Sequence, residues 1–173
     1  MEQFSAFLIP FVGLKDGIHH LDFKVDKTFF EGFDFLDFQN AMVAVDLVFE
    51  KKPTLLELNF SAKGQVKVPC DITTEFFDLP IDTAFRLVVK FGSLEKYDED
   101  EILILPHGSH EIQVAQYIYE IIVLSVPQKK VHPGIADGSL KSDILEKLKD
   151  LEPQEKPPSE DIDPRWNKLK DLL

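Results

Sequence analysis

The sequence predicts an α+β domain whose mostly antiparallel sheet is curved or barrel-like and packs on a buried helix. Three observations support this class: short apolar runs with strand-like alternation fill the first half of the chain, one long apolar segment follows at 114–126, and shorter amphipathic helices close the sequence. With 173 residues and 15 phenylalanines, the chain has enough apolar material for one packed core. We expect a core domain over 1–135 and a helical C-terminal extension over 136–173, which contains a Pro/Glu-rich linker and a docking helix.

Short β-like runs account for the sheet. Apolar and polar side chains alternate strictly in 56–61 (LELNFS), as in a strand with one buried face. A polar connection at 51–54 suits a hairpin, and Lys63-Gly64 is typical of a tight turn. We therefore expect one sheet of six or more strands, built from 5–12, 17–25, 41–50, 55–62, 65–70, 84–91 and 102–105.

An aromatic-rich segment, 25–40, follows the second of these runs. It holds five phenylalanines: Phe29, Phe30, Phe33, Phe35 and Phe38. A helical turn after Asp26 would place the first three on one face. Aromatic platforms that stack nucleic-acid bases normally lie beside Lys or Arg, whereas the neighbours here are Glu31, Asp34 and Asp37. We therefore interpret this cluster as part of the core.

The segment 114–126 is the predicted buried helix, because it is apolar around most of its circumference. Pro127 ends it, and the turn that follows at 128–134 is rich in positive charge. A second, amphipathic helix is predicted at 143–151, with one apolar face made of Ile144, Leu145, Leu148 and Leu151.

The last eleven residues, 163–173, predict a short docking helix. Asp163 is a good N-cap, Pro164 suits the first helical position, and apolar residues then recur at helical spacing: Trp166, Leu169, Leu172 and Leu173. Trp166 is the only tryptophan of the chain. Composition and periodicity do not decide between docking on the body and docking on a partner. We expect docking on the body, because an exposed indole beside leucines favours aggregation.

Charge and cysteine content exclude several classes of protein. The formal net charge is −12, and residues 1–126 hold 10 Lys and Arg against 21 Asp and Glu, whereas 127–173 hold 9 against 10. A broadly basic nucleic-acid surface is therefore not expected on the body. A single cysteine, Cys70, excludes an internal disulfide framework. No apolar run is long enough for a membrane span and no secretory signal is visible, so we expect a cytoplasmic protein with no membrane partner.

Candidate catalytic and metal-binding residues are few. The sequence has no phosphate-binding glycine loop, no Gly-x-Ser-x-Gly and no His-Glu-x-x-His, so we expect no enzyme, no cofactor and no small-molecule substrate. His107 and His110 flank Gly108 after a proline, where solvated turn histidines are more common than metal ligands. Cys70 has no basic neighbour in sequence that would lower its pKa, which favours a half-buried structural thiol over a nucleophile.

Three segments together carry a family resemblance: 64–71 (GQVKVPCD), the helix end 124–127 (LSVP) before the basic turn, and 163–166 (DPRW) ahead of a leucine-rich helix. In order and spacing they resemble the YceD-like family, known as large ribosomal RNA subunit accumulation proteins, and 114–133 and the tail look like its Bacteroidetes branch. The resemblance implies a small cytoplasmic bacterial protein that supports accumulation or processing of large-subunit (23S) ribosomal RNA, without an established catalytic activity.

The chain also departs from the family pattern. Many members have Cys-x-x-Cys where this chain has Cys70-Asp71-Ile72-Thr73, and further cysteines where it has 131–134 (VHPG). Thr73 does not replace a thiolate ligand, so no metal site is carried over.

Two functional hypotheses follow. In the first, the protein is a non-enzymatic ribosome biogenesis factor, and the residues that would face RNA are Lys129, Lys130, Arg165 and Lys168. In the second, the acidic body is a module that binds a basic ribosomal protein or assembly factor. A hydrolase using His107 or His110 is the least supported alternative.

Overall fold

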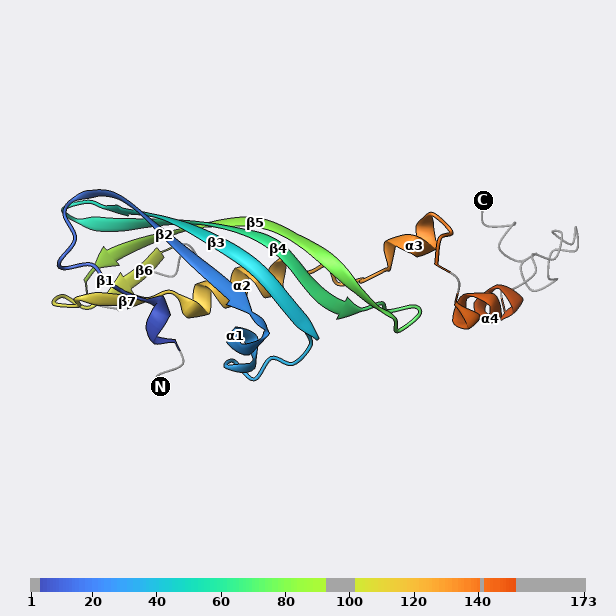
Figure 1. Cartoon of the computed structure of the whole chain (residues 1–173). Coiled ribbons are helices and arrows are strands. Elements are labelled where there is room, and N and C mark those ends of the chain that lie inside the picture. Colours follow the sequence, from blue (N-terminus) through green and yellow to red (C-terminus); the bar gives the residue numbers. More distant parts are fainter. Residues whose placement is uncertain (1–3, 93–101, 141, 152–173) are drawn as a thin grey trace, which may run out of the picture.

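The centre of the structure is a curved five-stranded sheet that wraps around one helix (Figure 1). The computed structural model describes residues 4–92, 102–140 and 142–151. The strand order is β2-β3-β4-β5-β6, and every pair is antiparallel except β5 and β6, which run parallel. The strands are β2 (Gly17–Asp26), β3 (Asn40–Lys51), β4 (Leu55–Pro69), β5 (Phe76–Phe91) and β6 (Ile102–Leu105).

Smaller elements surround this sheet. Strand β1 (Leu8–Pro10) pairs with β7 (Glu111–Gln113) in a separate antiparallel ribbon. The helices are η1 (Ser5–Phe7), α1 (Lys27–Glu31), α2 (Ala115–Ser125), α3 (Pro133–Ala136) and α4 (Asp143–Leu151). Figure 1 shows α3 and α4 beyond the end of the sheet where β4 turns into β5. Within the described residues, no helix combines the length and apolarity that a membrane crossing requires.

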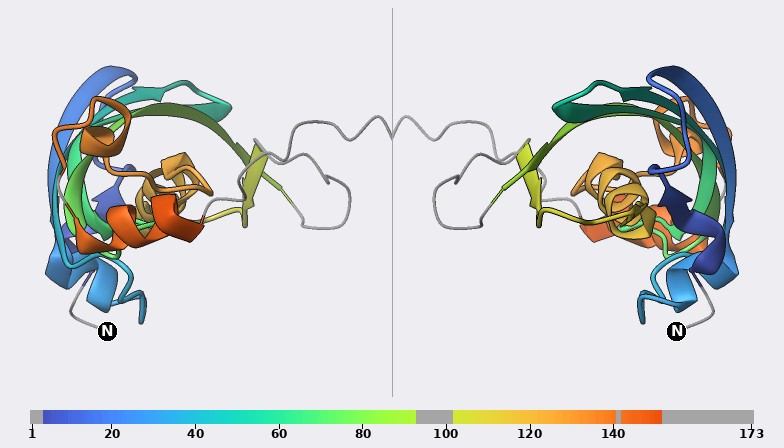
Figure 2. Two further views of the ribbon diagram at one scale, coloured as in Figure 1. Left: turned by 90° about the vertical axis from the view of Figure 1, so that its right-hand side faces the viewer. Right: turned by 90° about the vertical axis from the view of Figure 1, so that its left-hand side faces the viewer.

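Alternation along the strands creates a buried concave face. On β3, every second side chain from Ala41 to Phe49 is buried, while those between them face outward. Helix α2 fills the concave side, contributing Ala115, Ile118, Ile121 and Ile122 to the core. Figure 2 shows the sheet as an arc around this helix. The predicted α+β class with a mostly antiparallel, curved sheet is therefore confirmed, and the described strands do not close into a barrel.

One predicted turn is wrong. Lys63 and Gly64 lie inside β4, which is a single strand of 15 residues rather than two strands joined at this point. Gly64 is opposite Val43 of β3, and a Cβ atom on Gly64 would collide with the carbonyl group of Met42. The absence of a side chain at Gly64 therefore allows β3 and β4 to approach closely, and the chain does not reverse at this residue. Because the two predicted strands are one, and because the strand predicted at 5–12 forms β1 of the separate ribbon, the main sheet of the described residues has five strands instead of six or more.

The phenylalanine segment does form part of the core, as predicted. Phe29, Phe30 and Phe38 are buried, and Phe33 stacks on Tyr119 of α2 with ring centroids 4.5 Å apart and planes 19° apart. Phe4 and Phe7 from the N-terminal segment join the same cluster. These ring contacts fix α1 and the loop after it against α2.

Removing a buried side chain from α2 should destabilise the whole fold. Ile118 is fully buried, so Ile118→Ala is expected to lower the free energy of unfolding by about 2–5 kcal/mol through reduced burial and a residual cavity. Leu124 on the same helix is 82% exposed, so Leu124→Ala should change it by no more than about 0.5 kcal/mol. Urea unfolding of both variants measures the difference. Equal effects would show that α2 does not pack with this face on the sheet.

Candidate functional site

Three segments distant in sequence meet at the end of the sheet where β4 turns into β5. They are the loop 35–39 between α1 and β3, the turn region 69–76, and the segment 126–130 after α2. Two adjoining cavities of about 510 and 170 Å³ lie between them and share Asp37, Phe38 and Lys130 as lining residues. We call the two cavities together the end groove.

The end groove has a mixed lining in which large apolar side chains are open to solvent. Leu36 and Phe76 line the larger cavity and are 73% and 50% exposed, respectively. Val68, Val123 and Val126 line the smaller one. Single exposed apolar side chains are common, but two large ones in the same concave region are typical of a binding surface.

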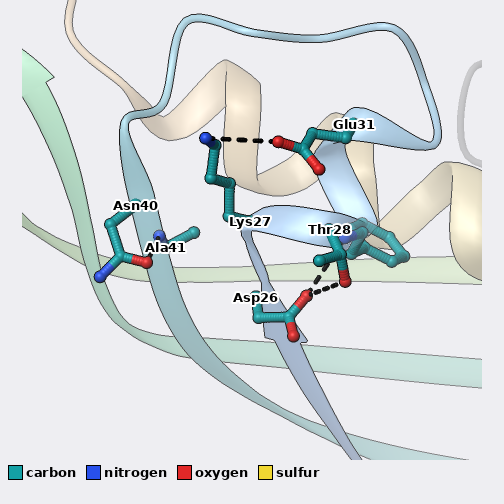
Figure 3. A network of polar contacts seen from close by, with 7 residues as sticks. Asp26, Lys27, Thr28, Glu31, Asn40 and Ala41 are labelled. Atoms are coloured by element: carbon teal, nitrogen blue, oxygen red, sulfur yellow. Dashed lines mark hydrogen bonds and ion pairs between the residues drawn. The ribbon is translucent and has the colours of Figure 1, made fainter.

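Helix α1 begins at a hydrogen-bonded cap (Figure 3) and contributes one residue to the lining of the larger cavity. The Asp26 carboxylate accepts hydrogen bonds from the Thr28 hydroxyl, at 2.6 Å, and from the backbone N–H of Phe29, at 3.2 Å. These bonds, the Thr28 bond most of all, hold the pKa of Asp26 below its usual value, so the cap is charged at neutral pH. Lys27 lines the cavity, and its ammonium lies 3.3 Å from a carboxylate oxygen of Glu31.

Reciprocal hydrogen bonds fasten the turn region to the segment after α2. The backbone N–H of Asp71 donates to the carbonyl of Lys130 at 2.8 Å, and the N–H of Lys130 donates to Oδ2 of Asp71 at 2.6 Å. The ammonium of Lys130 lies 4.0 Å from Oδ1 of the same carboxylate, with the Lys130 side chain 24% exposed. Lys130 is therefore partly engaged by the protein itself. Lys129 is exposed, and the described part of the chain provides no ion pair or hydrogen bond to its side chain.

Cys70 lies at the base of this junction. Its side chain is 1% exposed, and its sulfur accepts a hydrogen bond of 3.3 Å from the backbone N–H of His132. The chain reverses here through bonds from the N–H of Cys70 to the carbonyl of Glu75 and from the N–H of Thr74 to the carbonyl of Cys70. Thr74 adopts a φ of 61°, the left-handed conformation that this turn requires.

The thiol of Cys70 has an unusual pKa. Burial alone raises the pKa, but the hydrogen bond from the amide of His132, together with the nearby polar groups of Thr73 and the amide of Ile72, outweighs burial and lowers it to about 7. The amide of His132 is the best-defined donor, because the Thr73 hydroxyl, although completely buried beside the sulfur, has no partner at normal hydrogen-bond geometry within the described residues. Cys70 is buried more completely than the expected half-buried structural thiol, and its hydrogen-bond donor lies 62 positions away in sequence, where the local sequence does not indicate it.

Only some of the functional residues predicted from the sequence lie at this site. Lys130 and the acidic residue Asp37 line the end groove, and the exposed Lys129 precedes Lys130 in the chain. The other predicted RNA-facing and docking residues fall outside the described residues: Arg165, Trp166, Lys168, Leu169 and Leu172. The end groove was not predicted from the sequence, because its lining residues come from three separate segments and no local sequence pattern indicates a groove.

The histidines weighed as metal ligands are exposed. His107 and His110 lie in the turn between β6 and β7, and Nε2 of His110 is 3.8 Å from a carboxylate oxygen of Glu111. Among the described residues, no group of three or more His, Cys, Asp and Glu side chains is arranged to hold a metal ion. His19 and His20 follow each other in β2, where the ring of His19 lies near Phe49 while His20 is exposed.

The pKa of Cys70 predicts a pH-dependent contribution to stability. Because the folded-state pKa is about 7 against an ordinary 9.0, the thiolate stabilises the fold fully above pH 9, and this contribution is lost as the pH falls to 7. The free energy of unfolding of the native protein, minus that of Cys70→Ser, should therefore rise between pH 7 and pH 9. Chemical unfolding at both pH values measures this difference. A difference that stays constant would show that the thiol is not stabilised as a thiolate.

Comparison with known proteins gives one family. The model of the YceD family, described as large ribosomal RNA subunit accumulation protein, matches residues 58–173. Neither the curated proteins nor the solved structures contain a match to the chain. The matched region includes β4, β5, α2, the turn at Cys70 and the segment with Lys129 and Lys130. The chain belongs to the YceD family of large ribosomal RNA subunit accumulation proteins.

Proposed function

We propose that this protein is a non-enzymatic assembly factor that supports accumulation of large-subunit ribosomal RNA by binding the RNA directly. The family description links the chain to that RNA. The proposed contact surface is the basic segment beside the end groove, together with Lys168 of the C-terminal segment.

The single observation that supports this surface best is the state of Lys129. Its side chain is exposed and no described residue pairs with it, as is also true of Lys24, but Lys129 lies in the nearly neutral region after 127 rather than on the acidic body. An unpaired ammonium can exchange its counterion for a phosphate group without first breaking a bond within the protein. The region from 127 onward is also nearly neutral, in contrast to the acidic body, so repulsion of RNA is weakest there.

A second candidate function follows from the outer face of the sheet. Asp22 of β2 and Asp46 of β3 are directly opposite each other, and both are exposed. Like charges in directly opposed positions destabilise a sheet, so their presence on this acidic body favours a cationic partner. In this alternative the protein is an acidic module that binds a basic ribosomal protein or assembly factor, and the effect on RNA is indirect.

Charge reversal distinguishes the two proposals. In the first, Lys129→Glu combined with Lys168→Glu should abolish binding to large-subunit ribosomal RNA. The slope of log affinity against log salt should also fall by about 0.7–0.9 for each phosphate group that the variant no longer neutralises. Lys24→Glu is the matched control, since this lysine is exposed on β2 away from the end groove. Binding assays over a salt series measure both quantities.

Two results would decide between the proposals. If the double variant binds ribosomal RNA as the native protein does, direct contact through this surface is excluded. If Asp22→Asn with Asp46→Asn instead abolishes salt-sensitive binding of purified basic ribosomal proteins, the acidic module is the correct function.

A further inference from the structure

We propose that the C-terminal segment of the same chain, 163–173, docks as an amphipathic helix in the end groove and places Trp166 against Leu36 and Phe76. Docking there would also leave Lys168 at the same end of the protein as Lys129. A role of Lys168 in RNA binding rests on the proposed function, but the docking of the segment does not.

The groove is suited to a helix with an aromatic anchor. Its larger cavity, about 510 Å³, is lined by Leu36, Phe38, Pro69 and Phe76, and the smaller one continues it over valine side chains at the end of α2. Leu36 exposes most of its surface to water, and Phe76 exposes half. Covering both with apolar side chains is favourable in proportion to the area removed from water. An indole followed by leucines at helical spacing provides such a cover.

The length of the chain allows this return. The last described residue is Leu151, at the end of α4, and 11 residues separate it from Asp163. A fully extended linker of that length spans up to about 35–40 Å. Its three prolines, Pro153, Pro157 and Pro158, favour extended backbone. In Figure 1, α3 and α4 lie on the side of the molecule where β4 turns into β5, and that turn region forms one wall of the groove.

The charges of the two surfaces are complementary. At 100° per residue, Trp166, Leu169, Leu172 and Leu173 fall on one face of the helix, and Arg165 lies within this face, between Leu172 and Leu169. Asp37 lines both cavities of the groove, is exposed, and forms no ion pair with a described residue. Arg165 therefore meets this carboxylate when the apolar face enters the groove, while Lys168 lies at the flank of that face. Lys27 and Lys130 also line the groove, but Glu31 and Asp71 already face their ammonium groups.

The fluorescence of the single tryptophan tests the docking without any RNA. In the full-length native protein, Trp166 should emit at shorter wavelength than free tryptophan and resist quenching by acrylamide. Leu36→Asp and Phe76→Asp each place a charge in the groove at an exposed position, so both variants should fold, as circular dichroism can verify. Both should shift the emission to longer wavelength and increase quenching. Met42→Asp is the control, because Met42 is a 69% exposed apolar residue on β3 that does not line the groove.

Three results would overturn the proposal. Emission like that of free tryptophan in the native protein would show that the segment does not dock on the body. Equal shifts in Met42→Asp and Phe76→Asp would place the indole elsewhere. A short-wavelength emission that disappears on dilution would identify the tail of a second copy as the occupant. Lys129→Glu should leave the fluorescence unchanged, so failure of RNA binding in that variant tests the proposed function separately.

Discussion

The structure depends on the burial of α2 in the concave face of the sheet. Strands β3, β4 and β5 are long and strongly curved, and their inward side chains would remain in water without this helix. Ile118 and Ile122 are completely buried against them. The same helix determines the position of the end groove, because Val123 and Val126 at its carboxyl end line the smaller cavity and Pro127 ends the helix there.

The segment after α2 is held in place by hydrogen bonds rather than by burial. Asp71 and Lys130 exchange two hydrogen bonds, and the amide of His132 donates to the sulfur of Cys70. A chain segment without a strand or helix of its own is thereby fixed to the turn between β4 and β5. The basic residues of this segment consequently have a defined position beside the groove, which separates them from the acidic outer face of the sheet.

The sequence was most informative where local periodicity and burial agree. Alternation predicted β3 and the first half of β4, and the apolar segment 114–126 predicted α2 within one or two residues. The prediction from sequence failed at Gly64, because the reason for a glycine at this position lies on the neighbouring strand. A Cβ atom on Gly64 would collide with the carbonyl of Met42. The first half of β5 was missed because its outward residues, Asp78, Pro80 and Asp82, read as a loop. At the site, Lys129 and Lys130 were identified from the sequence, whereas the groove and the low pKa of Cys70 arise from residues far apart along the chain.

Site-specific photocrosslinking in growing cells tests most directly whether this end of the protein contacts ribosomal RNA. A photoreactive amino acid would replace Lys129, and in a second strain Lys24 on β2, followed by identification of the attached RNA and the attached proteins. We expect large-subunit ribosomal RNA to be attached through position 129 and not through position 24. Attachment of proteins alone at position 129, or of RNA at position 24 only, would contradict the account and direct attention to the acidic face.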